Sequence, residues 1–193
     1  MTATYEIYCK APNQSFVVMR SPRGEFKVGF DGQKGWTQTP QNRAQYDPEE
    51  KQLIERRDSD FYKYLHFSQH FPTAKVVGIE KVKQAKAYVV EATPAGTNSP
   101  ERLYFDIQTG LLILRDLSRK GEGGADMLDV VYYDDYRQIG EIKIAFTTTT
   151  VQGGVTIIFK HTEAENNVPV DDAIFNIPQR NETKSLVSRL SVF

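Results

Sequence analysis

The sequence predicts an α+β fold, mainly antiparallel β, in which a single highly curved sheet of about 10–11 strands forms a half-barrel under a short helical lid. Three observations support this prediction. Short runs rich in Val, Ile, Phe and Tyr recur along the chain, turn residues separate them, and only residues 48–69 have helical periodicity. So many consecutive antiparallel strands cannot stay flat, because each neighbour adds right-handed twist.

The stretch 86–116 shows the strand pattern most clearly. Three apolar runs are separated by turns at 93–100 and 106–110, where Pro and Gly interrupt the strands. Gly110 can adopt the positive φ that a hairpin turn requires. These features predict an antiparallel meander, which turn-bounded runs extend on both sides.

An alternating pattern also marks the first strands. Phe26, Val28 and Phe30 face one way, and Glu25, Lys27 and Asp31 face the other. Asp31-Gly32 is a hairpin signal that leads into a short run containing Trp36. We therefore expect the first strands to pair in sequence order.

Residues 48–69 are predicted to form one broken helix or two short helices. Asp47 is a suitable N-cap, and Pro48 suits the first helical position. Four large apolar residues then recur at roughly helical spacing: Leu53, Ile54, Phe61 and Leu65. This spacing predicts a lid whose apolar side covers the sheet.

Composition excludes several classes of protein. The 24 Lys and Arg residues balance 25 Asp and Glu residues, which argues against binding to nucleic acid or to an anionic membrane surface. A single cysteine, Cys9, excludes an internal disulfide and a multi-cysteine metal site. No apolar run is long enough for a transmembrane segment.

No catalytic motif is present. The chain has no Gly-x-Ser-x-Gly elbow and only three histidines. His66 and His70 are four residues apart, as two zinc ligands on a helix can be, but no third ligand is evident nearby. We therefore predict no enzyme activity, no metal and no cofactor.

Several segments resemble the LolA-like superfamily of periplasmic lipoprotein carriers and their outer-membrane lipoprotein-sorting relatives. The resemblance rests on residues 101–112, 132–137, 142–146 and 170–178, and on Gly29–Gly32 with Gly35-Trp36. It implies one half-barrel domain over residues 1–193, with a helical insertion at about 48–69 and a tail at about 179–193. Members of the superfamily normally open with a helix and a further strand, which this sequence lacks.

The resemblance also implies a function. It predicts a periplasmic protein, here without a signal peptide, that binds or carries a lipid, an acyl chain or an acylated protein in a hydrophobic cavity. Eight residues are candidates for the cavity lining: Phe26, Val28, Phe30, Trp36, Phe61, Leu65, Phe105 and Phe146. The same residues could instead fill a packed core, and Trp36 in particular could be core or pocket wall.

Two other functions stay open at this point. A packed β domain could dock an envelope or redox partner through an exposed sheet edge. An isomerase or hydrolase acting inside the cavity would need a buried pair of titratable groups. The first alternative predicts protein capture without lipid, and the second predicts a carboxylate or histidine that points into the hollow.

Overall fold

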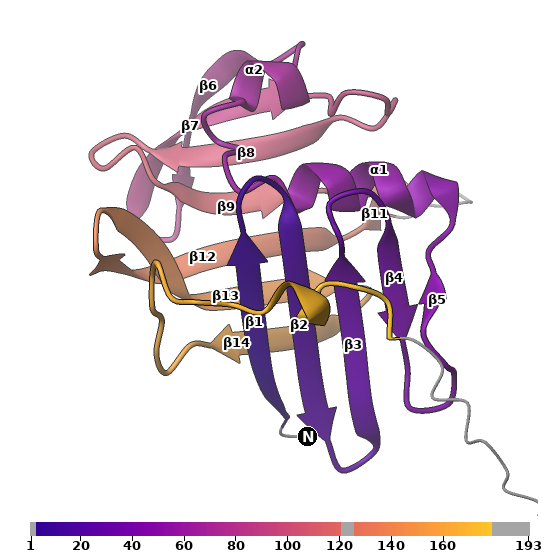
Figure 1. Cartoon of the computed structure of the whole chain (residues 1–193). Coiled ribbons are helices and arrows are strands. Elements are labelled where there is room, and N and C mark those ends of the chain that lie inside the picture. Colours follow the sequence, from indigo (N-terminus) through magenta and orange to yellow (C-terminus); the bar gives the residue numbers. More distant parts are fainter. Residues whose placement is uncertain (1–2, 121–125, 179–193) are drawn as a thin grey trace, which may run out of the picture. The chain divides into compact units, whose positions relative to one another are not determined.

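The structure is a computed structural model that describes residues 3–120 and 126–178 (Figure 1). The tail predicted at about 179–193 lies outside the described residues. The chain divides into two compact units, residues 1–62 with 170–193 and residues 63–169, called here the first and the second unit. The expectation of one domain over the whole chain stays a prediction.

The first unit contains a five-stranded antiparallel sheet whose strands lie in sequence order. Its strands are β1 (Thr4–Lys10), β2 (Gln14–Ser21), β3 (Gly24–Phe30), β4 (Gly35–Gln38) and β5 (Gln45–Tyr46). The predicted hairpin at Asp31-Gly32 is confirmed. Gly32 has a φ of 99°, and the Asp31 carboxylate accepts hydrogen bonds of 2.8 Å from the backbone N–H groups of Gln33 and Lys34.

The helical segment consists of two short helices, which confirms one of the two predicted alternatives. They are α1 (Glu49–Asp58) and α2 (Phe67–His70). The predicted N-cap is wrong, because Pro48 occupies that position and no side chain caps the helix. The Asp47 carboxylate instead accepts a hydrogen bond of 2.9 Å from Thr37 Oγ1. No helix in the described ranges is long and apolar enough to cross a membrane.

The second unit is built on a seven-stranded antiparallel sheet with the order β14-β13-β12-β9-β8-β7-β6. Its strands are β6 (Lys75–Val82), β7 (Ala85–Ala92), β8 (Glu101–Asp106), β9 (Leu112–Asp116), β12 (Asp129–Ile139), β13 (Ile142–Gln152) and β14 (Val155–Lys160). Strands β10 (Arg119–Lys120) and β11 (Asp126–Met127) pair with each other in a separate two-stranded ribbon. A 3₁₀ helix, η1 (Asp172–Ile174), belongs to the first unit.

The predicted fold class is confirmed: the chain is mainly antiparallel β, with few helices. The strands form two main sheets, however, where we expected one continuous sheet. The reason is local. Strand β5 has only two residues and leads directly into the helical segment, so the hydrogen-bonded ladder of the first sheet ends there.

One face of the seven-stranded sheet carries a contiguous apolar core. Its buried members come from four neighbouring strands, β7, β8, β9 and β12, and from the end of β6: Val82, Ala87, Val89, Tyr104, Leu114 and Val130. The register explains this grouping, because Val89 pairs with Tyr104, Tyr104 pairs with Leu114, and directly paired residues share a face.

Candidate functional site

Three of the predicted lining residues share one face of the first sheet. Phe26, Val28 and Phe30 alternate along β3, and Phe30 is buried whereas Phe26 is exposed. Trp36 lies on the opposite face, because it pairs with Gly29, which lies between Val28 and Phe30. The register therefore separates Trp36 from the other three residues.

Trp36 is packed tightly into the first unit. Its indole Nε1 donates a hydrogen bond of 2.8 Å to the backbone carbonyl of Phe175, and its ring centroid lies 5.9 Å from that of Phe16. A Cβ at Gly29 would stand only 2.4 Å from the indole ring. This geometry supports the core interpretation of Trp36.

Helix α1 covers the face that bears Phe30, and it does so with polar side chains. The Gln52 side chain accepts a hydrogen bond of 2.6 Å from Gly35 N and donates one of 3.0 Å to Gly35 O. The hydroxyl of Ser59, at the end of the helix, lies 2.7 Å from that of Ser15, which pairs with Phe30. Figure 1 shows α1 above the ends of β2 to β4.

Glu55 lies between α1 and β4. A Cβ at Gly35 would stand 1.6 Å from Glu55 Oε2, so only glycine leaves room for this carboxylate. Lys51 Nζ lies 3.1 Å from Glu55 Oε1, an ion pair without hydrogen-bond geometry. Burial, with a further contribution from the Asp47 carboxylate, raises the pKa of Glu55 to about 7, although Lys51 opposes the shift.

The four apolar residues whose spacing predicted the lid are exposed. The exposed fractions are 47% for Leu53, 47% for Ile54, 44% for Phe61 and 82% for Leu65. Tyr62 and Tyr64 in the same segment are also exposed. For Leu53 and Ile54 of α1 the prediction that the apolar side faces the sheet is wrong, because Gln52 contacts the backbone of Gly35 instead. The roles of Phe61 and Leu65 as cavity lining stay predictions.

Two lining candidates belong to the second sheet. Phe105 and Phe146 lie on the same face of this sheet. The paired residues Leu103, Arg115, Val131 and Thr150 share one face across β8, β9, β12 and β13. Phe105 is two residues after Leu103 and Phe146 is four residues before Thr150, so both side chains lie on that face. Phe146 is buried under the Arg137 guanidinium, which lies 4.2 Å from its ring centroid. Phe105 is half-buried against Phe67 of α2, with 6.3 Å between ring centroids.

The same face carries a buried ion pair that the sequence analysis missed. Glu101 lies on the same side of β8 as Leu103, its side chain is 1% exposed, and it accepts a hydrogen bond from Arg115 Nε. The sequence pattern that could have revealed Glu101 is its spacing, because Glu101, Leu103 and Phe105 are two residues apart in one strand and therefore share a face. The five lining candidates Phe26, Val28, Phe30, Trp36 and Phe61 belong to the first unit, and Leu65, Phe105 and Phe146 belong to the second.

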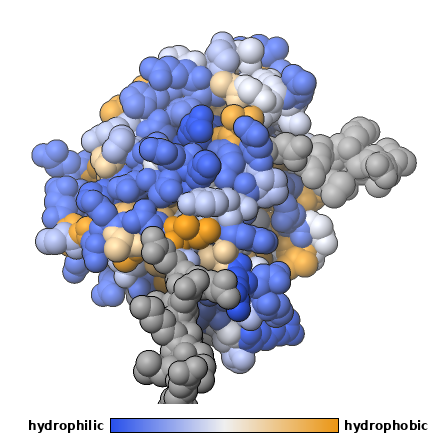
Figure 2. Space-filling model, turned by 45° about the vertical axis from the view of Figure 1, so that its right-hand side comes forward, coloured by the Kyte–Doolittle hydropathy of each residue, from blue (hydrophilic) through white to orange (hydrophobic). Residues whose placement is uncertain are grey.

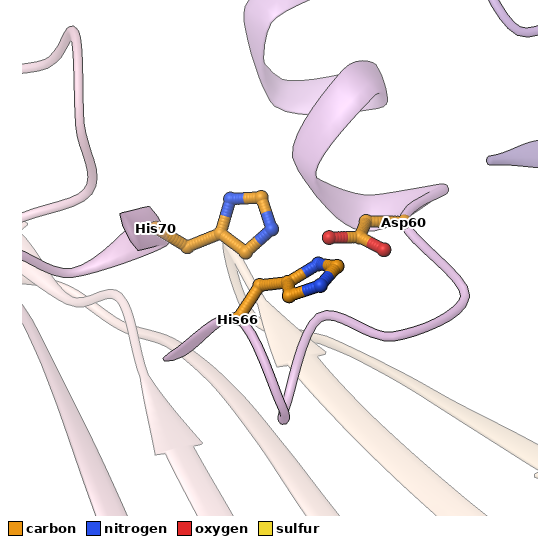
Figure 3. A group of neighbouring side chains, drawn as sticks. All are labelled: Asp60, His66 and His70. Carbon is orange, nitrogen blue, oxygen red and sulfur yellow. The ribbon is translucent and has the colours of Figure 1, made fainter. Parts of the chain in front are cut away.

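A group of possible metal ligands lies in the continuous stretch 60–70. Figure 3 shows the side chains of Asp60, which belongs to the first unit, and of His66 and His70, which belong to the second, and each offers one donor atom of a kind that metals bind. All three residues are half-buried.

Comparisons with known proteins show the fold. No protein-family model matches the chain, and no curated protein matches it. Three solved structures match, each over 90% of this chain. A LolA superfamily protein from Nitrosomonas europaea has 14% sequence identity, a TM-score of 0.60 and 81% of its own chain covered.

The other two structures are similarly distant. A putative outer membrane lipoprotein-sorting protein domain from Vibrio parahaemolyticus has 12% identity, a TM-score of 0.62 and 80% of its chain covered. A DUF1329 family protein from Desulfovibrio piger has 13% identity, a TM-score of 0.60 and 80% coverage. With its two antiparallel sheets and short helical segment, the chain therefore has the LolA-like fold.

Proposed function

We propose that this protein binds a lipid, an acyl chain or the acylated part of a lipoprotein in the bacterial cell envelope, without catalysing a reaction on it. The LolA-like fold supports a carrier of this kind, since one of the similar structures is a putative lipoprotein-sorting domain. The periplasm is the compartment in which such a carrier would act.

The observation that carries the proposal is the inverted orientation of α1. An ordinary surface helix buries its apolar residues and exposes its polar ones. Here Gln52 and Glu55 contact β4, whereas Leu53 and Ile54 are exposed. Large exposed apolar side chains that gather in one segment mark a surface that binds an apolar partner.

Figure 2 shows a face on which hydrophilic residues predominate and hydrophobic residues are exposed in several places. An acyl chain would cover such side chains and remove their apolar surface from water, at roughly 25 cal/mol for each Å². The predicted lining residues Phe61 and Leu65 belong to the same exposed segment as Leu53 and Ile54.

Titration with a fluorescent fatty acid tests the proposal. Ile54→Glu and Leu65→Glu each place a charge on the exposed apolar segment, and we expect each to weaken binding of the probe at least fivefold. Val155→Glu in β14 is the matched control, because Val155 is also a large exposed apolar residue, and we expect it to leave binding unchanged. Equal binding by all three variants, or no binding by the wild type, would contradict the proposal.

A second candidate function rests on the outer strands of the seven-stranded sheet. In the described part of the chain β6 and β14 each pair with one neighbour only, and both expose apolar residues: Val76, Val77 and Ile79 in β6, and Val155, Ile157 and Ile158 in β14. Such an edge could dock an envelope or redox partner by strand addition. Capture of a protein partner by delipidated protein that binds no fatty acid would favour this candidate.

A further inference from the structure

Helix α1 is attached to the first unit through polar side chains. Among the described side chains of this helix, Gln52, Glu55 and Arg57 are partly buried and none is fully buried, whereas Leu53 and Ile54 are exposed. Burial of apolar surface is the main stabilising term in packing, and an element that lacks it can separate locally at a fraction of the cost of global unfolding. The attachment of α1 to β4 therefore depends on a few polar contacts.

Glu55 is the least well satisfied of these contacts. Its side chain is only 11% exposed, and neither carboxylate oxygen has a hydrogen-bond partner in the described part of the chain. Gly35 of β4 leaves the space that this carboxylate occupies. A buried carboxylate without hydrogen bonds is costly in its charged form and much less so in its neutral form. The docked position of α1 therefore favours a protonated Glu55.

The neighbouring charges favour the same state. The charged groups that act on Glu55 are the Asp47 carboxylate and the Lys51 ammonium group. Lys51 Nζ lies 3.0 Å from Asp47 Oδ1 and 3.1 Å from Glu55 Oε1, so one lysine is shared by two carboxylates. Strand β4 contributes Gly35 and Thr37, which are uncharged. Ionisation of Glu55 would leave one uncompensated negative charge between α1 and β4.

We propose that ionisation of Glu55 releases α1 from β4, so that pH controls the docking of this helix. In the released helix the carboxylate is in water and ionises freely, so docking takes up one proton. The pKa of Glu55 is 4.5 in water and about 7 in the docked helix. Between these two values the ratio of released to docked helix rises by up to about tenfold for each pH unit, and at higher pH it stays level.

Release of α1 also has a consequence for ligand binding, which rests on the proposed function. The helix carries Leu53 and Ile54, two of the exposed apolar residues to which binding of an acyl chain is assigned. A released helix no longer holds these side chains in a fixed position. We therefore expect an acyl ligand to bind more tightly at pH 5 than at pH 8.

Amide hydrogen exchange of the full chain from pH 5 to pH 8 tests the switch. After correction for the intrinsic pH dependence of exchange, we expect the protection of residues 53–58 to fall at least about tenfold in the wild type. Protection in β12 and β13 of the second unit should stay constant. Glu55→Gln should keep α1 protected at every pH. Glu49→Gln is the matched control, because Glu49 is an exposed acid of the same helix, and it should behave like the wild type.

The wild-type measurement stands by itself if a variant fails to fold. Constant protection of α1 in the wild type, or an equal fall in Glu55→Gln, would overturn the proposal. Titration with a fluorescent lysophosphatidylcholine, whose charge is constant over this pH range, separates the switch from the proposed function. We expect its affinity to fall at least about threefold from pH 5 to pH 8 in the wild type, and to stay constant in Glu55→Gln. Protection that changes with pH in a protein that binds no such lipid would support the switch and contradict the proposed function.

Discussion

The two units stabilise their sheets with residues from different distances along the chain. In the first unit, Trp36 on β4 is held by the carbonyl of Phe175, a residue 139 positions later. Lys10 of β1 forms an ion pair with Asp172 of the same late segment. In the second unit, each strand of the seven-stranded sheet pairs with the strand of that sheet that follows it in the sequence. Strands β10 and β11 are not part of this sheet and form a separate ribbon.

The difference has consequences for folding and for stability. Contacts between distant residues cost more loop-closure entropy than contacts between adjacent hairpins. The first unit needs residues 170–176 to complete its packing, whereas the second can form its core from successive hairpins. We therefore expect substitutions in the two units to act on different parts of the chain, which hydrogen exchange can resolve.

The largest effect is expected from the buried ion pair of the second unit. Arg115→Met would leave the Glu101 carboxylate buried without this partner, at a cost of about 3 kcal/mol in the free energy of unfolding. Lys75→Met, which breaks the exposed pair between Lys75 and Glu91, is the control and should cost less than about 0.5 kcal/mol. Urea unfolding measures both values, and equal values for the two variants would refute the assignment.

A glycine pair compares the two units directly. Gly29→Ala would place a methyl group 2.4 Å from the buried Trp36 ring and should cost about 2 kcal/mol. Gly78→Ala in β6 meets nothing within 4 Å and should be close to neutral. Hydrogen exchange should show faster exchange in residues 3–62 and 170–178 for Gly29→Ala only. Loss of protection throughout the second unit as well would contradict independent stabilisation of the units.

The smallest effect concerns the pH dependence of the first unit. The pKa of Glu55 rises from 4.5 to about 7 on folding, so the folded state binds the proton more tightly. The Glu55 contribution to stability is therefore present at low pH and is lost as pH rises from about 4.5 to about 7. Glu55→Gln, which cannot ionise, should gain stability relative to the wild type across this range. Stability curves that stay parallel from pH 4 to pH 8 would exclude this role.

Local signals predicted the hairpins correctly. Asp31-Gly32 and Gly110 adopt the positive-φ turns that their residue types favour, with φ values of 99° for Gly32 and 70° for Gly110. The face on which Trp36 lies was not predictable, because it depends on the pairing of Gly29 with Trp36 across that hairpin. A shift of one residue in this register would transfer Trp36 to the other face.

The orientation of α1 was missed for a different reason. Helical periodicity shows that one side of a helix is apolar, but it does not say whether that side faces protein or a ligand. Here the sheet presents the backbone N–H and C=O groups of Gly35, which Gln52 satisfies.

Native mass spectrometry of the protein produced in a bacterial periplasm tests the central claim most directly. We predict a population heavier than the polypeptide by the mass of one acyl lipid, which organic extraction removes and an added fatty acid restores. The same preparation of Leu65→Glu should carry less lipid than Val155→Glu. A single species at the polypeptide mass, unchanged by added fatty acid, would contradict lipid binding by this protein.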